Sequence, residues 1–500
     1  MKFSAVAAAI PALAGVTNAF YSKEDYVSGK VHQDIMEEKM RQWHEHEVAG
    51  DYQSAKWSGF DSWSQSRGGP VRCRNGLAVA KQGDPLQTFR CKDTDLYDFK
   101  SHAELGGNNS SGSGSWGWTF GRREFAAIGQ SDGVAFAEVT RNGKLEYLGR
   151  LPQQHTALPS QWRELKTNGN YLVVGSEAVN HGVQFFDMRK LLTLSPRQPK
   201  TFDTRTDLTG WFNELPAGRS HNVVVDEESN YVVAVGAQPR NDSCAAGLIF
   251  IDVKDPSNPK KTGCAPQDGY IHDAQCIVYR GPDRKYNGKQ ICYGYNEDTL
   301  TIYDVSNKNG GNASTVISRT PYKGASYTHQ GWVIDPNWQT HLIMDDELDE
   351  GLRPDRASPE SPALDGFPVT YIFNIESLEA PKNTGFYKSG VRSIDHNQYI
   401  YDGLAYQSNY GAGLRVLDIS SIPDKEDGSE IEEVAFFDIY PEDDNEPGGG
   451  NATFVGTWNH YTYPSGYVVV NTIERGAFVV KLSKFRGRGK GKRFVRRGQL

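Results

Sequence analysis

The chain has 500 residues, of which 37% are hydrophobic, and its net charge is −8 at pH 7. This length allows several domains or one large repeat array. After the N-terminus no apolar run is long enough to cross a bilayer, so we expect no transmembrane segment, and the acidic balance argues against nucleic-acid binding by the folded body.

The first residues predict a secretory signal peptide over 1–19. Lys2 gives the positive start, residues 5–16 the apolar core and residues 17–19 a small-residue cleavage site. A short buried strand or helix is the alternative. A signal peptide places the protein in the extracellular space or at the cell surface. Five N-x-S/T sequons in polar, glycine-rich surroundings support a secreted glycoprotein: Asn108, Asn109, Asn241, Asn312 and Asn451.

Residues 20–110 predict a lead-in to the main fold. Val31, Ile35, Met40, Trp43 and Val48 recur at roughly helical spacing, which predicts a short helix packed against the body. The run HEHE at 44–47 has the residue types of a metal site, but histidines two positions apart lie on different faces of a helix. A solvated helix face is therefore the simpler interpretation.

The six cysteines contain no C-x-x-C pair, which argues against a zinc ribbon or a thioredoxin motif. An oxidising compartment favours disulfides. The nearest pairs along the chain are Cys73 with Cys91, Cys244 with Cys264, and Cys276 with Cys292, although the sequence alone leaves the connectivity open.

One short apolar pattern recurs seven times, at starts about 57 residues apart on average. Its copies are GVAFAEV (133), GVQFFDM (182), GLIFIDV (247), TLTIYDV (299), VTYIFNI (369), GLRVLDI (413) and GAFVVKL (476). Each copy follows a second strand-like segment, and further strand-like segments flank the pair. The count is four strands per repeat, and the interval suits a propeller blade.

The sequence therefore predicts an all-β fold, a seven-bladed β-propeller over residues 111–483. Long helical patterns are absent from residue 110 onward, which removes α/β barrels. We expect residues 101–115 to be a flexible loop and residues 484–500, with eight Lys or Arg and no acid, to be a basic disordered tail. The tail is either simply solvated or a site for anionic glycans, membrane surface or nucleic acid.

Several long segments resemble the LVIVD-repeat proteins of the choice-of-anchor B family. They include SWGWTFGRREFAAIGQSDGVAFAEV, AGRSHNVVVDEES, DGYIHDAQCIVYRGPD, CYGYNEDTLTIYDVS, YTHQGWVID, MDDELDEG and IDHNQYIYDGLAYQSNYGAGLRVLDIS, and the likeness covers about residues 70–482. It implies a secreted or surface-displayed seven-bladed propeller without a settled activity. Fungal relatives are sometimes labelled as the regulatory P domain of a subtilisin-like proprotein convertase, but a single jelly-roll does not fit the sevenfold repeat.

Four histidines each stand just before an apolar run that we assign to the innermost strand of a blade: His221, His272, His329 and His396. They should therefore ring one mouth of the central channel, with His460 as a weaker fifth member. The following strands return to the same face, and we expect their ends to bring carboxylates to this mouth: Glu177, Glu297, Asp298, Asp345, Asp346, Glu347 and Glu474.

Histidines and carboxylates at one mouth suit a divalent metal ion such as Zn, Mn or Ca. Two or three neighbouring histidines with Asp273, Asp395 or Asp346 form the expected ligand set, since four cannot reach one ion across a wide channel. One alternative is structural, with each imidazole bonded to the backbone carbonyl of the next blade. Another is a metal-free ligand funnel. The acidic run 345–350 lacks the EF-hand pattern, so we expect a solvated loop there.

No nucleophile elbow, P-loop or HExxH motif is present, so the sequence assigns no catalytic residue. The function that we expect is a monomeric binding or interaction module for an extracellular protein or glycan. The alternative is a metal-dependent propeller enzyme, a hydrolase or lyase, with the histidine and carboxylate site at the channel mouth.

Overall fold

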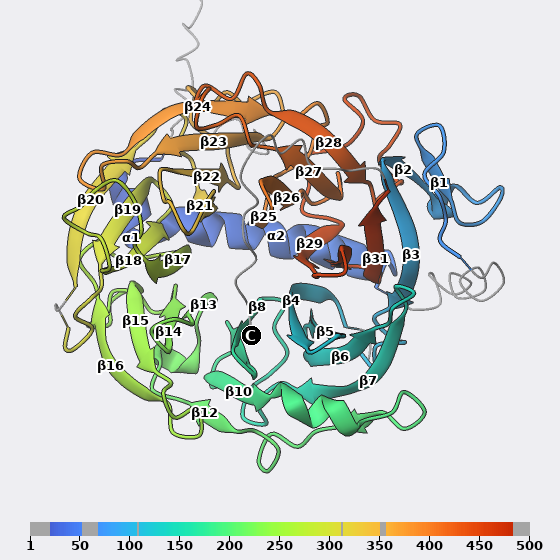
Figure 1. The fold of residues 1–500 in the computed structure, drawn as a ribbon, viewed down its shortest axis with the longest axis horizontal. Coiled ribbons are helices and arrows are strands. Elements are labelled where there is room, and N and C mark those ends of the chain that lie inside the picture. Colours follow the sequence, from blue (N-terminus) through green and yellow to red (C-terminus); the bar gives the residue numbers. More distant parts are fainter. Residues whose placement is uncertain (1–20, 53–68, 108–109, 312–313, 351–356, 484–500) are drawn as a thin grey trace, which may run out of the picture.

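The computed structural model describes residues 21–52, 69–107, 110–311, 314–350 and 357–483. Seven antiparallel sheets stand radially around a central axis, and their innermost strands face the centre (Figure 1). This arrangement confirms the seven-bladed propeller. The expected signal peptide, the basic tail and the sequons at Asn108, Asn109 and Asn312 lie outside the described residues.

Each blade has four strands in antiparallel order from the axis outward, apart from short additions at the rim. Blade 1 contains β4 (Gly112–Phe120), β5 (Arg123–Gln130), β6 (Gly133–Val139) and β7 (Leu145–Pro152), with β11 (Lys200–Thr201) at its edge. Blade 2 contains β8 (Arg163–Asn168), β9 (Tyr171–Ser176), β10 (Val183–Asp187) and β12 (Gly210–Phe212). Blade 3 contains β13 (Asn222–Asp226), β14 (Tyr231–Val235), β15 (Leu248–Asp252) and β16 (Lys260–Ala265).

The next two blades follow the same order. Blade 4 contains β17 (Asp273–Val278), β18 (Gln290–Tyr295), β19 (Thr299–Asp304) and β20 (Thr315–Pro321). Blade 5 contains β21 (Thr328–Val333), β22 (His341–Asp346), β23 (Val369–Asn374) and β24 (Lys382–Lys388). Among the described residues, 3₁₀ turns lie in the connections at η2 (Pro85–Gln87), η3 (Met188–Thr193) and η4 (Pro216–Gly218).

The last two blades include strands from the lead-in. Blade 6 contains β25 (Gln398–Tyr401), β26 (Leu404–Ser408), β27 (Leu414–Asp418) and β28 (Glu432–Phe437), extended by β2 (Thr88–Lys92) and β1 (Leu77–Val79). Blade 7 contains β29 (Thr457–Thr462), β30 (Tyr467–Thr472) and β31 (Gly476–Leu482), with β3 (Thr94–Ser101) as its outermost strand. The ring is therefore closed by an N-terminal strand, and the propeller extends across the boundary expected at residue 110.

Apolar side chains on both faces of the middle strands fill the wedges between blades. Phe136 of β6 and Phe186 of β10 stack at 5.0 Å, and Phe202 packs edge-on against Phe186 at 4.7 Å, which joins blades 1 and 2. Burial of one such ring contributes about 1.5–3 kcal/mol relative to exposure. The seven apolar repeats found in the sequence form this packed layer. The segment expected to be a loop at 101–115 already enters β4 at Gly112, where the small residues fit the crowded axis.

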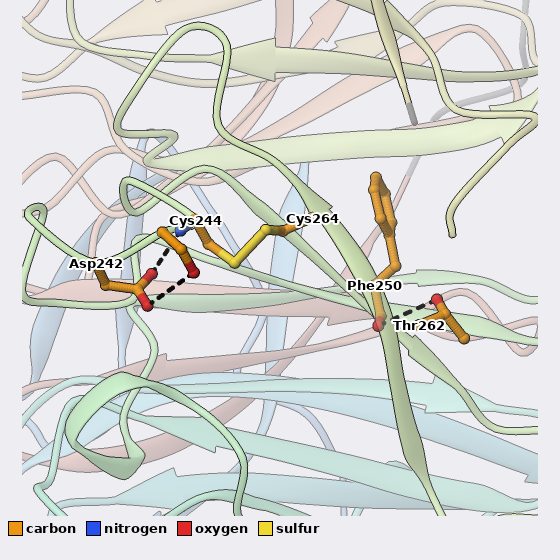
Figure 2. The surroundings of a disulfide bond; sticks show 6 residues. Asp242, Cys244, Phe250, Thr262 and Cys264 are labelled. Atoms are coloured by element: carbon orange, nitrogen blue, oxygen red, sulfur yellow. Dashed lines mark hydrogen bonds between the residues drawn. A yellow bond between two sulfur atoms is a disulfide. The ribbon is translucent and has the colours of Figure 1, made fainter. Parts of the chain in front are cut away.

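The three disulfides join the pairs nearest along the chain, Cys73–Cys91, Cys244–Cys264 and Cys276–Cys292. Cys276 and Cys292 stand opposite each other on β17 and β18. Cys244 lies in the connection before β15 and its partner on β16, and Asp242 accepts a hydrogen bond from the Cys244 amide at 2.7 Å (Figure 2). The expected pairing is confirmed, and no cysteine in the described residues is free.

Two helices lie across the centre of one face of the ring (Figure 1). They are α1 (Lys23–Ser28), which begins at a capping box of Ser22 and Asp25, and α2 (Lys30–Val48). Trp43 donates to the carbonyl of Phe454 at 2.8 Å, and Gln42 accepts from the Phe454 amide at 3.0 Å. Within the described residues no helix is apolar enough, over a sufficient length, to span a membrane.

The helix expected in the lead-in is confirmed over the length of the apolar spacing at 31–48, but Met40 and Val48, two of the residues in that spacing, are exposed. It buries one face that includes His32 and Lys39 as well as Ile35 and Trp43. The HEHE run lies at the other end of α2, where His44 is exposed and His46 contacts Asp51 at 2.6 Å. These two histidines do not meet, which agrees with a solvated helix face.

Candidate metal centre at the channel mouth

Four histidines from four successive blades form a contiguous arc at the mouth of the channel. His221 precedes β13, His272 precedes β17, His329 lies on β21 and His396 precedes β25. Successive ring centroids are 4.2, 4.3 and 4.6 Å apart. The inner strands converge on the axis, so the same position in neighbouring blades brings these side chains into contact.

Backbone hydrogen bonds fix the orientation of two of these rings. Nδ1 of His272 donates to the carbonyl of His329 at 2.9 Å, and Nδ1 of His396 donates to the carbonyl of Trp458 at 2.7 Å. These are the inter-blade ties that the structural alternative predicted. They also place the proton on Nδ1, so Nε2 of each ring keeps the lone pair that a metal ion needs.

Burial keeps three rings of the arc neutral. It lowers the pKa values of His272 and His329 well below the usual range and that of His396 to about 4. Neutral imidazole is the form that binds metal ions. These three rings therefore present ligands rather than positive charge at neutral pH.

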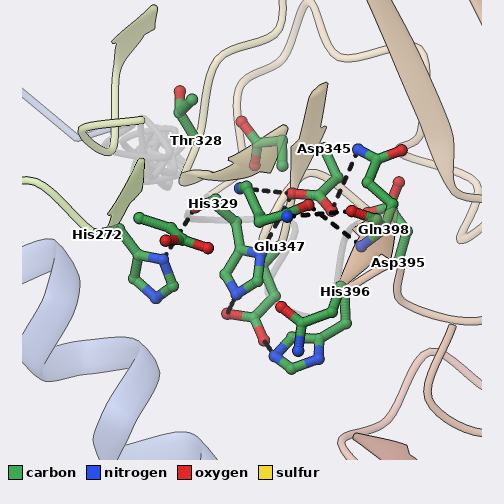
Figure 3. A network of polar contacts seen from close by, with 12 residues as sticks. His272, Thr328, His329, Asp345, Glu347, Asp395, His396 and Gln398 are labelled. Carbon is green, nitrogen blue, oxygen red and sulfur yellow. Dashed lines mark hydrogen bonds and ion pairs between the residues drawn. The ribbon is translucent and has the colours of Figure 1, made fainter. Parts of the chain in front are cut away.

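Glu347, at the end of β22, lies against the arc. Its Oε2 is 3.7 Å from Nε2 of His329 and its Oε1 is 3.6 Å from Nε2 of His396 (Figure 3). His272, His329 and Glu347 each offer one ligand atom, and these three atoms lie within 4.8 Å of one another. Donors around a tetrahedral zinc ion are about 3.3 Å apart, given bonds of about 2.0–2.1 Å. Small side-chain movements would close the set around one ion.

Lys39 of α2 occupies the other side of Glu347. Its Nζ is 2.6 Å from Oε1 of Glu347, and the side chain is 3% exposed. Tyr410 also donates to Oε1 at 2.6 Å, whereas Oε2 has no hydrogen-bond partner in the described part of the chain. Burial opposes the charge on Glu347, but the ammonium of Lys39 is the main opposing influence, and the pKa of Glu347 is lowered to about 2. The carboxylate is therefore ionised and one of its oxygens faces the arc.

His221, at one end of the arc, and a further histidine from α2 extend the polar contacts around it. Nδ1 of His221 lies 2.5 Å from Oε1 of Glu177. His32 of α2 contacts the hydroxyl of Tyr327 at 2.7 Å, and burial lowers its pKa well below the usual range. Both rings are buried. Helix α2 therefore covers the polar groups around the arc on the face of the ring where it lies.

The other residues expected as ligands lie outside the close cluster. Asp346 accepts hydrogen bonds from Tyr322 and from the amides of Ser326 and Tyr327, which ties it to the loop before β21. Asp273 bonds the amide of Ala274, and burial raises its pKa to about 7. Both carboxyl groups therefore accept hydrogen bonds from nearby backbone amides and do not join the ligand cluster.

His460 is separate from the arc. It packs beside Tyr399 and Tyr406, with Nδ1 at 2.8 Å from the hydroxyl of Ser408. Burial lowers its pKa to about 3. The structure gives it no place among the mouth histidines.

The acidic run 345–350 is buried, so the expectation of a solvated loop is wrong. Asp349 is fully buried and accepts from the hydroxyls of Ser361 and Tyr371, and Glu350 is 2% exposed. Burial raises the pKa values of Asp345, Asp349 and Glu350 well above the usual range. Asp395 joins this group, since its amide donates to Glu350 at 2.9 Å. Burial favours the protonated form of these four carboxyl groups, in contrast to Glu347.

Two spaces adjoin the arc. A cavity of about 10 Å³ lies among the four histidines, Trp162 and Trp458, which is close to the least space that holds one water molecule. A cleft of about 820 Å³ opens between α2 and the propeller, and Trp162 lines both spaces. Trp162 therefore stands between the histidine cavity and the cleft along α2.

No protein-family model matches the chain, and no curated protein is significantly similar to it. The propeller architecture therefore stands on the structure alone. The site likewise has to be interpreted from its own residues.

Sequence reasoning located the four mouth histidines but not the residues that complete the centre. Glu347 was expected near the mouth, yet only the structure distinguishes it from Asp346, which points into the backbone. Lys39 and His32 carry no sequence signal, since a lysine or histidine on a helix is ordinarily exposed. Their roles depend on how α2 docks on the propeller.

Proposed function

We propose that this protein is a metal-dependent β-propeller enzyme with one divalent ion at the channel mouth. The observation that carries the proposal is the buried cluster of His272, His329 and Glu347, whose ligand atoms lie within 4.8 Å of one another. Both rings are neutral, the tautomer of His272 is fixed by its bond to the His329 carbonyl, and the carboxylate is ionised, which are the protonation states that metal binding requires.

The chemistry of the ligand atoms narrows the choice of metal ion. Two imidazoles and one carboxylate suit zinc or another transition ion such as manganese, whereas calcium prefers oxygen ligands throughout. His396 stands next in the arc as a further ligand. We therefore place zinc first and manganese second.

The chemistry that such an ion supplies is activation of a water molecule or polarisation of a substrate oxygen. Hydrolysis and elimination both use these effects, so the reaction class that we propose is a hydrolase or a lyase. The cavity has room for about one water beside the arc. Glu177, paired with His221 at the edge of the cleft, is placed to accept a proton from a group bound there.

A second candidate function is a binding module without catalysis, which the cleft along α2 favours. Its volume of about 820 Å³ is in the range of small-molecule sites. For either function we propose an extracellular glycoprotein related to the LVIVD-repeat proteins. Three disulfides support an oxidising compartment, and Asn241 is an exposed sequon residue at the rim of the cleft.

Elemental analysis of the purified, dialysed protein tests the metal centre. We expect about one equivalent of zinc or manganese in the wild type and its loss in a His272→Ala, His329→Ala double variant, since both ligands disappear. His155→Ala is the matched control, because His155 is exposed and remote from the arc.

The proposal fails if the wild type takes up no stoichiometric ion even after incubation with excess zinc or manganese. It also fails if the double variant retains the ion while it remains folded. In the first case the arc serves only to tie the inner strands together, and the binding-module function takes precedence.

A further inference from the structure

The cleft along α2 has one wall from the helix and one from the loops of blades 2 and 3. Met36 and Met40 of α2 give it an apolar side. Trp162, Glu177 and Arg219 face them from the propeller. The cleft thus combines a hydrophobic wall with a few polar groups, as small-molecule sites do.

Of the charged groups that line the cleft, Arg240 and Glu177 have partners of opposite charge or hydrogen-bond partners, and Arg219 differs from them. Arg240 makes two hydrogen bonds to Glu297, at 2.7 and 2.9 Å. Glu177 is engaged by His221 at 2.5 Å. Arg219 forms no ion pair with any described residue, and its Nε is buried without a hydrogen-bond acceptor in the same part of the chain. The cleft therefore contains one guanidinium without a counter-charge.

A second unsatisfied donor lies in the same cleft. Nε1 of Trp162 is buried and has no acceptor among the described residues. The indole packs against Trp43 of α2, with ring centroids 5.2 Å apart, so its position is fixed by the helix. Buried donors are nearly always paired, and because Trp162 also lines the cleft, its unpaired N–H suggests an acceptor that a ligand supplies after a small side-chain movement.

We propose that Arg219 and Trp162 bind the oxyanion of a small organic acid or acidic sugar in this cleft. A guanidinium matches a carboxylate or a phosphate with two parallel hydrogen bonds, and an indole N–H donates one more. The two methionines contact the uncharged part of the ligand. This assignment names the substrate or ligand class of the proposed function, but it does not require the metal ion.

The carboxylate of Glu177 in the cleft determines the orientation of the bound ligand. Glu177 repels a second anion, so the oxyanion lies at Arg219 and the rest of the ligand extends past Trp162 toward the arc. Trp162 lines both the cleft and the histidine cavity. A ligand held in this way brings its uncharged portion to the candidate centre.

Isothermal titration calorimetry with four probes tests the proposal: glucuronate, glucose, inorganic phosphate and sulfate. Glucuronate and glucose differ in the carboxylate alone. We expect at least one oxyanion probe to bind the wild type, and glucose to bind much more weakly. Comparison of glucuronate with phosphate and sulfate identifies the kind of oxyanion. An EDTA-treated sample should give the same result, which separates this site from the metal centre.

Three variants complete the test. We expect Arg219→Gln to weaken oxyanion binding about tenfold or more, since a charge-assisted hydrogen bond is lost. Trp162→Phe keeps a ring but removes the donor and should weaken binding less. Arg122→Gln is the matched control, because Arg122 is exposed on a distant turn of blade 1.

Arg219→Lys keeps the charge without the planar fork and serves if the glutamine variant does not fold. Its affinity should fall between those of the wild type and the glutamine variant. The proposal is overturned if no oxyanion binds the wild type at tens of millimolar, or if folded Arg219 variants and the wild type bind equally well.

Discussion

Replacement of Lys39 by methionine will lower the stability of the metal-free protein by about 3–5 kcal/mol, the usual cost of removing one partner of a buried ion pair. Lys39 and Glu347 are both almost fully buried, and their charged atoms are 2.6 Å apart. Methionine preserves most of the side-chain volume, so the change isolates the charge. Glu347 then loses the ammonium that holds its pKa at about 2, and the pKa rises as burial dominates.

The same variant will bind the proposed metal ion more tightly than the wild type. Lys39 places a positive charge on Oε1 of Glu347, and a divalent ion at the arc is repelled by it. Without that charge, zinc binds at the arc under α2 and compensates the negative charge of Glu347. Zinc should therefore restore most of the stability that the metal-free variant loses.

Urea unfolding in EDTA and in excess zinc, followed by far-UV circular dichroism, measures both effects. A Lys39→Met, Glu347→Gln double variant is the control, since it contains neither charge and loses a metal ligand. It should be more stable in EDTA than Lys39→Met alone and should not respond to zinc. A Lys39→Met protein as stable as the wild type would show that the ion pair contributes little, and an equal response of both variants to zinc would exclude Glu347 as a ligand.

The repeated strand pattern explains why the sequence predicts so much of the fold. GVAFAEV and its six counterparts are the third strands of the blades and are buried at nearly every position, so the number of blades follows from their spacing. The four histidines at the starts of β13, β17, β21 and β25 recur at similar places in that repeat, and the structure brings them together.

Features outside the repeat could not be derived in this way. β3 belongs to blade 7, but its sequence TDLYDFKS stands almost 400 residues before β31 and carries no mark of that pairing. The docking of α2 is likewise a tertiary event, and it decides that Lys39 meets Glu347 and that the acidic run 345–350 is covered. Composition predicted solvent exposure for the acidic run because charged residues are ordinarily exposed.

The two interpretations of the histidines proved to be compatible. Nδ1 of His272 and of His396 ties one blade to the next, as the structural interpretation predicts. That bond also sets the tautomer in which Nε2 can bind a metal ion. The close approach of Glu347 is therefore the feature that favours a metal centre over simple ties, and it is the feature that sequence spacing did not single out.

The second large effect is a loss of stability at alkaline pH, caused by carboxyl groups buried away from the histidine arc. Burial raises the pKa of Glu474 to about 8 and that of Asp438 to about 7. Glu474 is 2% exposed, and both of its oxygens accept from the amide of Gly456 at 3.0–3.1 Å. At neutral pH the folded protein therefore retains protons that the unfolded chain has released.

The sign follows from proton linkage. Where the folded state binds more protons than the unfolded state, the free energy of unfolding falls as pH rises. For Glu474 this stabilisation is complete below pH about 4.5 and is lost as pH rises through about 8. Each retained proton contributes a slope of roughly 1.4 kcal/mol per pH unit within that window.

Glu474→Gln should therefore flatten the decline of stability between pH 6 and pH 9 and should be more stable than the wild type at pH 9. Glutamine keeps an oxygen to accept from Gly456 but has no proton to lose.

Asp427→Asn is the control, because Asp427 is exposed and its pKa is lowered, to about 2, so it is already ionised throughout this range. Urea unfolding in EDTA at pH 6, 7, 8 and 9 measures the slopes. Two results would contradict this prediction: a wild type whose stability rises with pH across this range, or a glutamine variant that declines as steeply as the wild type. Either result would show that Glu474 is ionised in the folded protein. The hydrogen bonds from the Gly456 amide would then offset the effect of burial on its pKa.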